Sequence, residues 1–213
     1  MAADPTPLRD LYAPRRVGAT STPFAGRIWS VESEEVALET GPVTRDFIRH
    51  PGAVAVMVYD GDGGVYLVHQ YRHPVRRDLW EPPAGLLDID NEDPLIAAQR
   101  ELAEEADLIA ATWHVLADFY TSPGGSSEAI RIYVARDVSP VPEGDRHERE
   151  AEEFEMTGAW VPLADVLAAV AAGTVGAPTL TVGAFALDAA IRSGWATLRP
   201  ADAPWVAREN VPR

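Results

Sequence analysis

Residues 85–108 read GLLDIDNEDPLIAAQRELAEEADL and carry the strongest structural signal in this chain. Within them, the spacing of Glu101, Glu104 and Glu105 puts three carboxylates on one face of a helix. These like charges repel, and a divalent cation that prefers oxygen ligands, such as Mg²⁺ or Mn²⁺, would remove the repulsion. Asp93 suits an N-cap and Pro94 suits the first helical position. The sequence therefore predicts a helix from about Pro94 with a metal-binding face.

The same stretch resembles the Nudix box, in which a Gly, a Glu and an Arg-Glu-apolar-x-Glu-Glu run recur at fixed offsets. Two positions depart from the usual pattern. Six residues separate Gly85 from Glu92 where five are usual, and Asp107 replaces the closing Gly. Asp tolerates the left-handed conformation expected at a helix end better than most residues do. The matching residues are Gly85, Glu92, Arg100, Glu101, Leu102, Glu104, Glu105 and Leu108. The alternative is a solvated acidic helix face, but the coincident offsets favour the box.

Composition excludes several classes of chemistry. The chain has 213 residues, 46% of them hydrophobic, which is enough for a sizeable core. It contains no Cys and no Lys, so disulfides, zinc–thiolate sites, Schiff-base lysines and P-loop lysines are excluded. A formal net charge of -15 disfavours nucleic acid and anionic membranes as partners. No apolar run is long enough to span a membrane, and we expect a soluble cytoplasmic protein.

Hydrophobic periodicity predicts an α/β (α+β) fold, with a mixed β-sheet sandwiched by helices and a small N-terminal β domain. Residues 1–24 favour a mobile tail. The Asp60–Gly64 turn between two apolar runs predicts a hairpin. Strands are expected at 27–30, 36–38, 43–48, 53–59, 65–71, 112–120, 130–138 and 157–161, and further helices at 164–172 and 181–193. The tail after Ala196 reads as irregular. Together with the family resemblance, which implies the dimerisation and hydrolase roles, the expected domains are residues 1–50 for the tail and small β dimerisation domain, 51–200 for the Nudix hydrolase domain, and 201–213 for a C-terminal tail.

Three further stretches resemble the ADP-ribose pyrophosphatase branch of the Nudix family. They are YRHP at 71–74, LWEPPAGLLD at 79–88 and YTSPGGSSE at 120–128. The extra residue before Glu92 also occurs in this branch. The resemblance implies a homodimer built through the N-terminal β domain, and hydrolysis of ADP-ribose to AMP and ribose 5-phosphate.

The resemblance also assigns the metal site. It implies that Glu101 and Glu105 bind Mg²⁺ or Mn²⁺, that Glu104 joins a multi-metal site, and that the Ala84 carbonyl is a further ligand. It also implies that Arg100 pairs with Glu92 and holds the loop that begins at Gly85 against the helix. Cations bound there would attract an anionic substrate despite the acidic surface.

The catalytic base is expected outside the box, in the acidic loop around residues 148–153. The branch places its base in a Glu-x-Glu-acidic pattern, which implies Glu150 as base and Glu152 as an additional metal ligand. Glu148 and Glu153 are alternatives, because a shift of register by two residues is easy here. Glu104 is the alternative within the box, and a solvated charged loop is the alternative without chemistry.

Substrate contacts are predicted at three positions. Arg72 matches a phosphate-contacting Arg of the branch, and its forked guanidinium suits diphosphate oxygens. Arg45 is a weaker candidate of the same kind, and Glu128 matches a residue near the substrate or the dimer interface. An exposed strand Arg and an ordinary loop carboxylate are the structural alternatives. Trp29 and Phe47 could stack on adenine, although aromatic residues of a small β domain more often form its core.

Competing functions follow from the same motifs. A hydrolase of other nucleoside diphosphate sugars would keep the same box, since the box fixes the chemistry and not the organic groups. A Nudix-like sensor that binds ADP-ribose without turnover would be expected to lose box glutamates. A protein-interaction scaffold is the third alternative.

Overall fold

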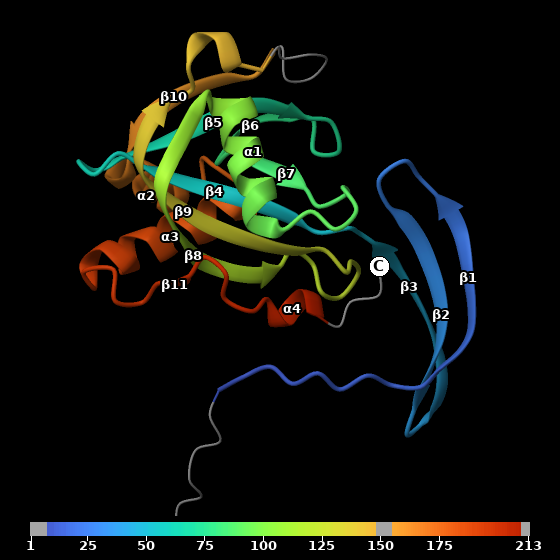
Figure 1. The fold of residues 1–213 in the computed structure, drawn as a ribbon. Helices are drawn as coiled ribbons and strands as arrows, with labels where there is room; N and C mark the ends of the chain where they lie inside the picture. Colours follow the sequence, from blue (N-terminus) through green and yellow to red (C-terminus); the bar gives the residue numbers. More distant parts are fainter. Residues whose placement is uncertain (1–7, 148–154, 210–213) are drawn as a thin grey trace, which may run out of the picture.

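The computed structural model describes residues 8–147 and 155–209, and these form two β-sheets (Figure 1). The first is a three-stranded antiparallel sheet in the order β1-β2-β3. Its strands are β1 (Val17–Ala25), β2 (Ser30–Leu38) and β3 (Gly41–Arg49). In Figure 1 this blue sheet stands beside the main body, which the chain enters directly after β3.

The main sheet has eight strands and runs β10-β5-β4-β9-β8-β11, with β6 paired to β5 and β7 paired to β4. The β4–β9 pair is parallel and the other pairs are antiparallel, so the sheet is mixed. Its strands are β4 (Ala53–Tyr59), β5 (Gly64–Arg72), β6 (Arg77–Glu81), β7 (Ala84–Leu86), β8 (Leu108–Tyr120), β9 (Ala129–Pro140), β10 (Thr157–Pro162) and β11 (Arg199–Pro200).

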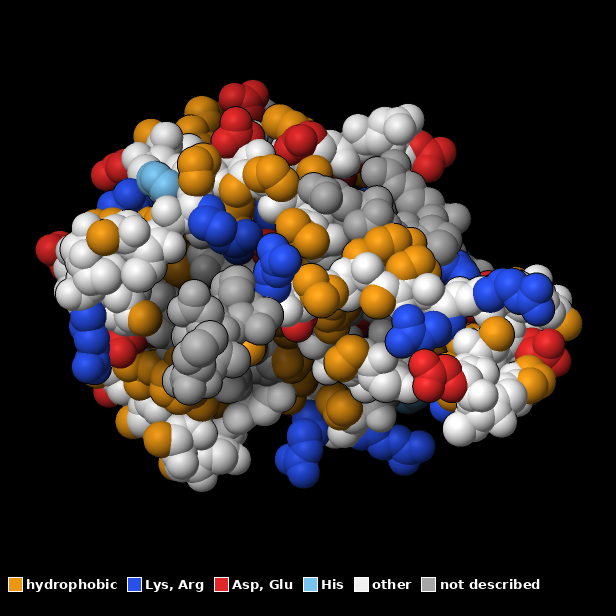
Figure 2. Space-filling view, turned by 90° about the horizontal axis from the view of Figure 1, so that it is seen from below, with side chains coloured by type: hydrophobic (Ala, Val, Ile, Leu, Met, Phe, Trp, Pro, Cys, Tyr) orange, Lys and Arg blue, Asp and Glu red, His pale blue; other side chains and the backbone are white. Residues whose placement is uncertain are grey.

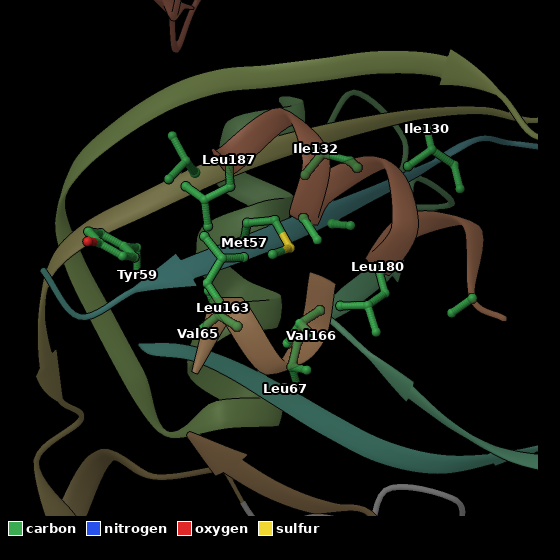
Figure 3. Packing of buried hydrophobic residues seen from close by; sticks show 14 residues of the cluster. Met57, Tyr59, Val65, Leu67, Ile130, Ile132, Leu163, Val166, Leu180 and Leu187 are labelled. Atoms are coloured by element: carbon green, nitrogen blue, oxygen red, sulfur yellow. The ribbon is translucent and has the colours of Figure 1, made fainter. Parts of the chain in front are cut away.

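Helices cover both faces of this sheet because β4, with the sequence AVAVMVY, is apolar on both sides. Val54, Val56 and Val58 pack with α1, whereas Ala55, Met57 and Tyr59 pack with α2 and α3. Figure 3 shows the buried cluster on the side of α2 and α3, with Met57 beside Leu187. A methyl group on Gly183 of α3 would lie 2.7 Å from the Met57 side chain, so this glycine lets α3 approach the sheet. The helices are α1 (Pro94–Ala106), α2 (Leu163–Ala172), α3 (Pro178–Arg192), α4 (Val206–Glu209) and the 3₁₀ turn η1 (Glu143–Asp145).

Helix α1 begins and ends as the sequence predicts. The Asp93 carboxylate accepts a hydrogen bond from the Leu95 N–H (2.8 Å), and Pro94 occupies the first turn. Asp107 has φ 53° and ψ 34°, which is the left-handed conformation, and its N–H donates to the Ala103 carbonyl. The mixed sheet between helices confirms the expected fold class. Among the described residues, no helix is both long and apolar enough to cross a membrane.

The N-terminal sheet has no core of its own. None of the described residues before Gly52 is buried, and large apolar side chains of this sheet are open to solvent, among them Val17, Phe24 and Leu38. Two backbone hydrogen bonds tie the end of this sheet to the main body. The Ile48 N–H donates to the Gly125 carbonyl, and the Ser127 N–H donates to the Ile48 carbonyl, both at 2.9 Å. The end of β3 is therefore anchored to the Gly-rich loop between β8 and β9.

Several secondary-structure predictions were wrong. The expected mobile tail contains β1, and residues 27–29, expected to begin a strand, connect β1 to β2. Strand β1 is exposed along its whole length, so it has no alternating apolar pattern to reveal it. Strands β6 and β7 are short and were not predicted, and the tail after Ala196 contains β11 and α4 rather than irregular chain alone. Helix α3 begins at Pro178, three residues before its predicted start.

Candidate active site

The acidic face of α1 is organised around a single guanidinium. Arg100 Nη1 donates to a carboxylate oxygen of Glu101 at 2.7 Å and to one of Glu104 at 3.0 Å. The same side chain also forks onto Glu92, from Nε at 3.0 Å and from Nη2 at 3.1 Å. Two carboxylates of the helix and one of the preceding loop therefore share one cation. The hydrogen bonds to Glu92, followed by the charge of Glu101 and the hydrogen bonds to Glu101 and Glu104, raise the pKa of Arg100, although partial burial opposes them.

Glu105 links α1 to β7. Its carboxylate is buried and accepts a hydrogen bond from the Ala84 N–H at 2.9 Å. Gly85 follows directly, and a Cβ atom on this residue would overlap the Glu101 carboxylate. This glycine is required by close packing and not by an unusual backbone conformation, since its φ is not positive. The structure therefore contains the expected contact between Arg100 and Glu92. Gly85 leaves space for Glu101, which is one of the predicted metal ligands.

The donor chemistry of this cluster fits a hard divalent cation. Glu92, Glu101, Glu104 and Glu105 supply only oxygen atoms, and one guanidinium does not balance four carboxylates. As the side chains stand, no three acidic or histidine groups in the described ranges converge closely enough to hold a metal ion. The reason is visible in the contacts: Glu101 and Glu104 turn toward Arg100, and Glu105 turns toward the Ala84 N–H. A cation would have to draw these carboxylates together.

The predicted base and its neighbours lie outside the described residues. This applies to Glu150 and Glu152 and to the alternatives Glu148 and Glu153. The flanking elements η1 and β10 are described, and β10 pairs along its whole length with β5, the strand that ends at Arg72.

Arg72 forms an ion pair that the sequence did not reveal. Its Nε donates to both oxygens of Glu81, at 3.3 and 3.1 Å, and its Nη2 donates at 2.7 Å. Gln70 Nε2 also donates to Glu81, at 3.1 Å. The Glu81 side chain is 9% exposed and the Arg72 side chain is 42% exposed. A buried carboxylate therefore orients an accessible guanidinium. The signal in the sequence that could have pointed to Glu81 is its position as a charged residue between Trp80 and Pro82.

The other two predicted substrate contacts lie elsewhere in the fold. Arg45 is exposed on β3, opposite Glu34 of β2, and donates to the Thr44 carbonyl at 3.1 Å. It therefore belongs to the N-terminal sheet, whereas the acidic face belongs to α1. Glu128 lies after the Gly-rich loop, where it accepts a hydrogen bond from the Thr121 hydroxyl at 2.6 Å.

Glu128 also faces His50, at the junction between the two sheets. His50 Nε2 lies 3.6 Å from a Glu128 oxygen, and His50 Nδ1 accepts a hydrogen bond from the Gly52 N–H at 3.1 Å. Burial lowers the pKa of His50, while the Glu128 carboxylate acts in the opposite direction. The sequence gave no signal for His50, since its role depends on where β3 meets the Gly-rich loop.

A cavity of about 450 Å³ lies at this junction. The box loop between Gly85 and Glu92 forms one of its walls, so the cavity adjoins the acidic cluster without including its glutamates. Trp29, which the sequence offered as an aromatic contact, lines the cavity and is 40% exposed. Figure 2 shows hydrophobic side chains exposed between scattered Arg side chains on one face of the molecule. The cavity is lined by residues 26–30, 49–52 and 87–91 together with Ser127, Ala129 and Arg208.

Comparison with known proteins decides the family. The NUDIX domain family model matches residues 49–179, which is more than half of the chain. The chain belongs to the Nudix family. The match contains the helix α1 cluster and the Arg72–Glu81 pair, and it ends inside α3. Residues 26–30 and Arg208, which line the cavity, lie outside it.

Relatives of this Nudix protein extend the similarity beyond the matched domain. An ADP-ribose pyrophosphatase of Mycobacterium tuberculosis is 39% identical over 194 residues, which cover 91% of this chain and 92% of that protein. An ADP-ribose pyrophosphatase of Bacillus subtilis is 36% identical over 132 residues, 62% of this chain and 70% of the relative. A crystal structure described as an ADP compounds hydrolase superposes with a TM-score of 0.67 and 23% identity, covering 87% of this chain and 98% of that one. At this identity the solved structure supports the fold alone.

The packing of Gly85 yields a first prediction. Gly85→Ala places a methyl group on the Glu101 carboxylate, so Glu101 must leave its place beside Arg100. Metal affinity, measured by titrating Mn²⁺ and following its bound fraction, should fall by roughly tenfold or more, on the scale of one lost charge contact. The control is Gly124→Ala, because a Cβ atom there meets no neighbouring atom. Equal metal affinity in the two variants would contradict the role of Gly85.

Proposed function

We propose that this protein is a metal-dependent hydrolase that splits ADP-ribose into AMP and ribose 5-phosphate. The observation that carries the proposal is the cluster of carboxylates on α1, gathered around Arg100 and packed against Gly85. The named ADP-ribose pyrophosphatase relatives support the substrate, because the longer alignment spans both sheets. Mg²⁺ and Mn²⁺ are the cations we propose, since both accept oxygen-only ligand sets.

Glu101, Glu104, Glu105 and the Ala84 carbonyl are the groups that we propose hold the cation. When bound, the cation neutralises charge on the diphosphate and makes a water more acidic. Glu150 is the proposed base: it takes the proton of the water as the new bond to phosphorus forms and the bond to the bridging oxygen breaks. Glu152 is the proposed additional ligand. The leaving phosphate carries away the electron pair of the broken bond, so the products are two phosphomonoesters.

Arg72 is the proposed contact for the diphosphate. Its guanidinium is held in a fixed plane by Glu81 while part of it stays accessible. Such preorientation reduces the side-chain entropy lost when a phosphate oxygen binds. Glu128 and Arg45 are proposed as further substrate contacts. Glu128 contacts His50, and His50 lines the junction cavity. Arg45 would reach a substrate where a second copy of the chain brings its N-terminal sheet over the site.

Hydrolysis of another nucleoside diphosphate sugar is the second candidate function. The acidic cluster acts on a diphosphate, and nothing in its geometry selects the organic groups on either side. A sensor without turnover is disfavoured because Glu101, Glu104 and Glu105 all lie on one helix face, next to the glycine that accommodates one of them.

We further propose that the protein is a homodimer and that residues 1–50 form its dimerisation unit. The three-stranded sheet has no buried residue, and an isolated sheet of this size is marginally stable at best. Burial of its exposed apolar side chains would stabilise this sheet. A second copy of the chain can bury them in a symmetric interface, as in most soluble homo-oligomers. The anchoring of Ile48 to the Gly-rich loop holds the sheet away from the body, where such a partner can reach it.

The metal site and the substrate are tested together. Purified protein should release AMP and ribose 5-phosphate from ADP-ribose with Mg²⁺ or Mn²⁺, faster than it cleaves GDP-mannose, ADP-glucose, NADH or diadenosine polyphosphates. Glu105→Gln keeps an oxygen for the Ala84 N–H but removes the charge. Turnover should fall by roughly 10²-fold or more, as for other lost charge stabilisation in a transition state. The exposed Glu39→Gln is the control. Near-normal turnover of Glu105→Gln with an unchanged metal requirement would refute the assignment.

The position of the base is tested by four variants, Glu148→Gln, Glu150→Gln, Glu152→Gln and Glu153→Gln. Glu150→Gln should lower kcat by roughly 10²- to 10⁴-fold with little change in KM, the range expected for a general base. Glu152→Gln should mainly shift the response to metal concentration, and the other two should be milder. If only Glu148→Gln or only Glu153→Gln loses activity, the base lies two residues before Glu150 or three residues after it. If none of the four loses more than about tenfold, Glu104 becomes the better candidate.

The dimer is tested with two matched substitutions. Phe24→Asp places a charge on the N-terminal sheet, whereas Phe185→Asp places one on α3, and the two phenylalanines are similarly exposed, at 52% and 54%. Light scattering at micromolar concentration should give twice the chain mass of 23.0 kDa for the unmodified protein and for Phe185→Asp. Phe24→Asp should shift the population toward monomer. A monomeric unmodified protein would overturn the dimer itself.

A further inference from the structure

The wall of the junction cavity includes a residue from the far end of the chain. Arg208, in α4, borders the cavity together with Trp29 and the box loop. The family domain ends at residue 179, so the common chemistry of the family does not account for this contribution. Walls built outside the shared domain are suited to distinguishing substrates, because the groups that cleave the diphosphate lie inside it.

A buried ionic network fixes the segment that carries Arg208. Arg131 of β9 is 3% exposed and forks onto Asp118 of β8, with contacts of 2.8 and 2.9 Å. Its remaining N–H groups donate to the carbonyls of Ala203 at 2.7 Å and Pro204 at 3.0 Å. Arg199 adds a second cation on Asp118, at 2.8 Å. Truncating any partner would leave buried charge or buried polar atoms unpaired, so this network holds the chain firmly.

Aromatic contacts then set the direction of α4. Trp205 is 6% exposed and lies 5.0 Å from the Arg131 guanidinium. The Tyr120 hydroxyl donates to the Ala207 carbonyl at 3.1 Å, and the Arg208 N–H donates to the Trp205 carbonyl at 2.9 Å. The Arg208 guanidinium lies 5.7 Å from the Trp205 ring. Backbone and side chain of Arg208 are therefore both restrained where it meets the cavity.

We infer that the segment Arg199–Arg208 is a specificity element, and that Arg208 contacts the nucleobase of the substrate. This rests on the proposed hydrolysis of a nucleoside diphosphate sugar. The box loop that borders the cavity leads from Gly85, so a diphosphate held at the acidic cluster extends an organic group toward it. A guanidinium plane and the indole of Trp29 both suit the flat face of a purine. The lining carries Asp88 and Asp90 as well as Arg27, Arg49 and Arg208, so its charges are mixed and the flat aromatic and guanidinium groups are what favour a nucleobase there.

The test compares Arg208→Ala and Arg208→Lys in the full-length protein, with Arg192→Ala as the control. Arg192 is on α3, is 77% exposed, and pairs only locally with Asp188 among the contacts described. For both Arg208 variants, KM for ADP-ribose should rise by about 3- to 30-fold, the scale of a cation–π or stacking contact, while kcat stays within about twofold. Arg208→Lys keeps a cation near the Trp205 ring, so its thermal unfolding should match that of the unmodified protein, and a rise in KM in that variant separates lost recognition from lost folding.

Product binding locates the contact. Equilibrium titration should show weaker AMP binding in both Arg208 variants and unchanged ribose 5-phosphate binding. If Arg208→Lys behaves like the unmodified protein, the contact is a point charge on phosphate and the nucleobase assignment is wrong. If neither KM nor AMP affinity changes, the segment is not a specificity element. If the unmodified protein hydrolyses no nucleoside diphosphate sugar, the proposed function fails, and the AMP titration still tests Arg208 separately.

Discussion

Charge balance at Arg100 is the constraint on which the site depends. Glutamates on one helix face repel, and a cation among them relieves that repulsion. In this structure Arg100 fills that position by contacting Glu92, Glu101 and Glu104. The contact with Glu92 also closes the loop from β7 onto α1, so one side chain both assembles the carboxylates and fixes the loop that borders the cavity. A bound divalent cation would compete with this guanidinium for Glu101 and Glu104, and loss of Arg100 would remove the positive charge that contacts both of them.

The sequence predicted those parts whose causes lie close together in the chain. Helix α1 has its cap, its first proline, its left-handed end and its acidic face within residues 93–107, and all of them were readable. The apolar run of β4 and the Asp60 turn were equally local. Strand β1 was missed because both of its faces meet solvent. The pair between Arg72 and Glu81 was missed because it joins two neighbouring strands, β5 and β6. The sequence does not show how these strands pair, and in the structure Arg72 lies opposite Arg77 while Glu81 lies opposite Val68.

The cavity could not have been predicted, because it is assembled from segments far apart in sequence. Ile48 fixes the N-terminal sheet to the Gly-rich loop, His50 faces Glu128 across that joint, and Arg208 arrives from the opposite end of the chain. Family resemblance supplied Arg45 and Glu128 as candidates, and the strand expected at 43–48 already placed Arg45 in the N-terminal β domain. Trp29 was ambiguous between core and ligand contact, and its partial exposure at the cavity favours the second.

Among the described residues of this lysine-free chain, arginine serves different purposes in three of the ionic networks. At Asp118, two guanidiniums share one carboxylate and fix a segment of backbone. At Glu81, one guanidinium meets one carboxylate, which orients Arg72 without removing it from solvent. At Arg100, the carboxylates outnumber the guanidinium. A lysine ammonium could neutralise these groups but could not hold two or three of them in a plane. Of these three networks, only the one on α1 has more carboxylates than guanidiniums, and this is the feature behind the proposed divalent-cation site on the helix.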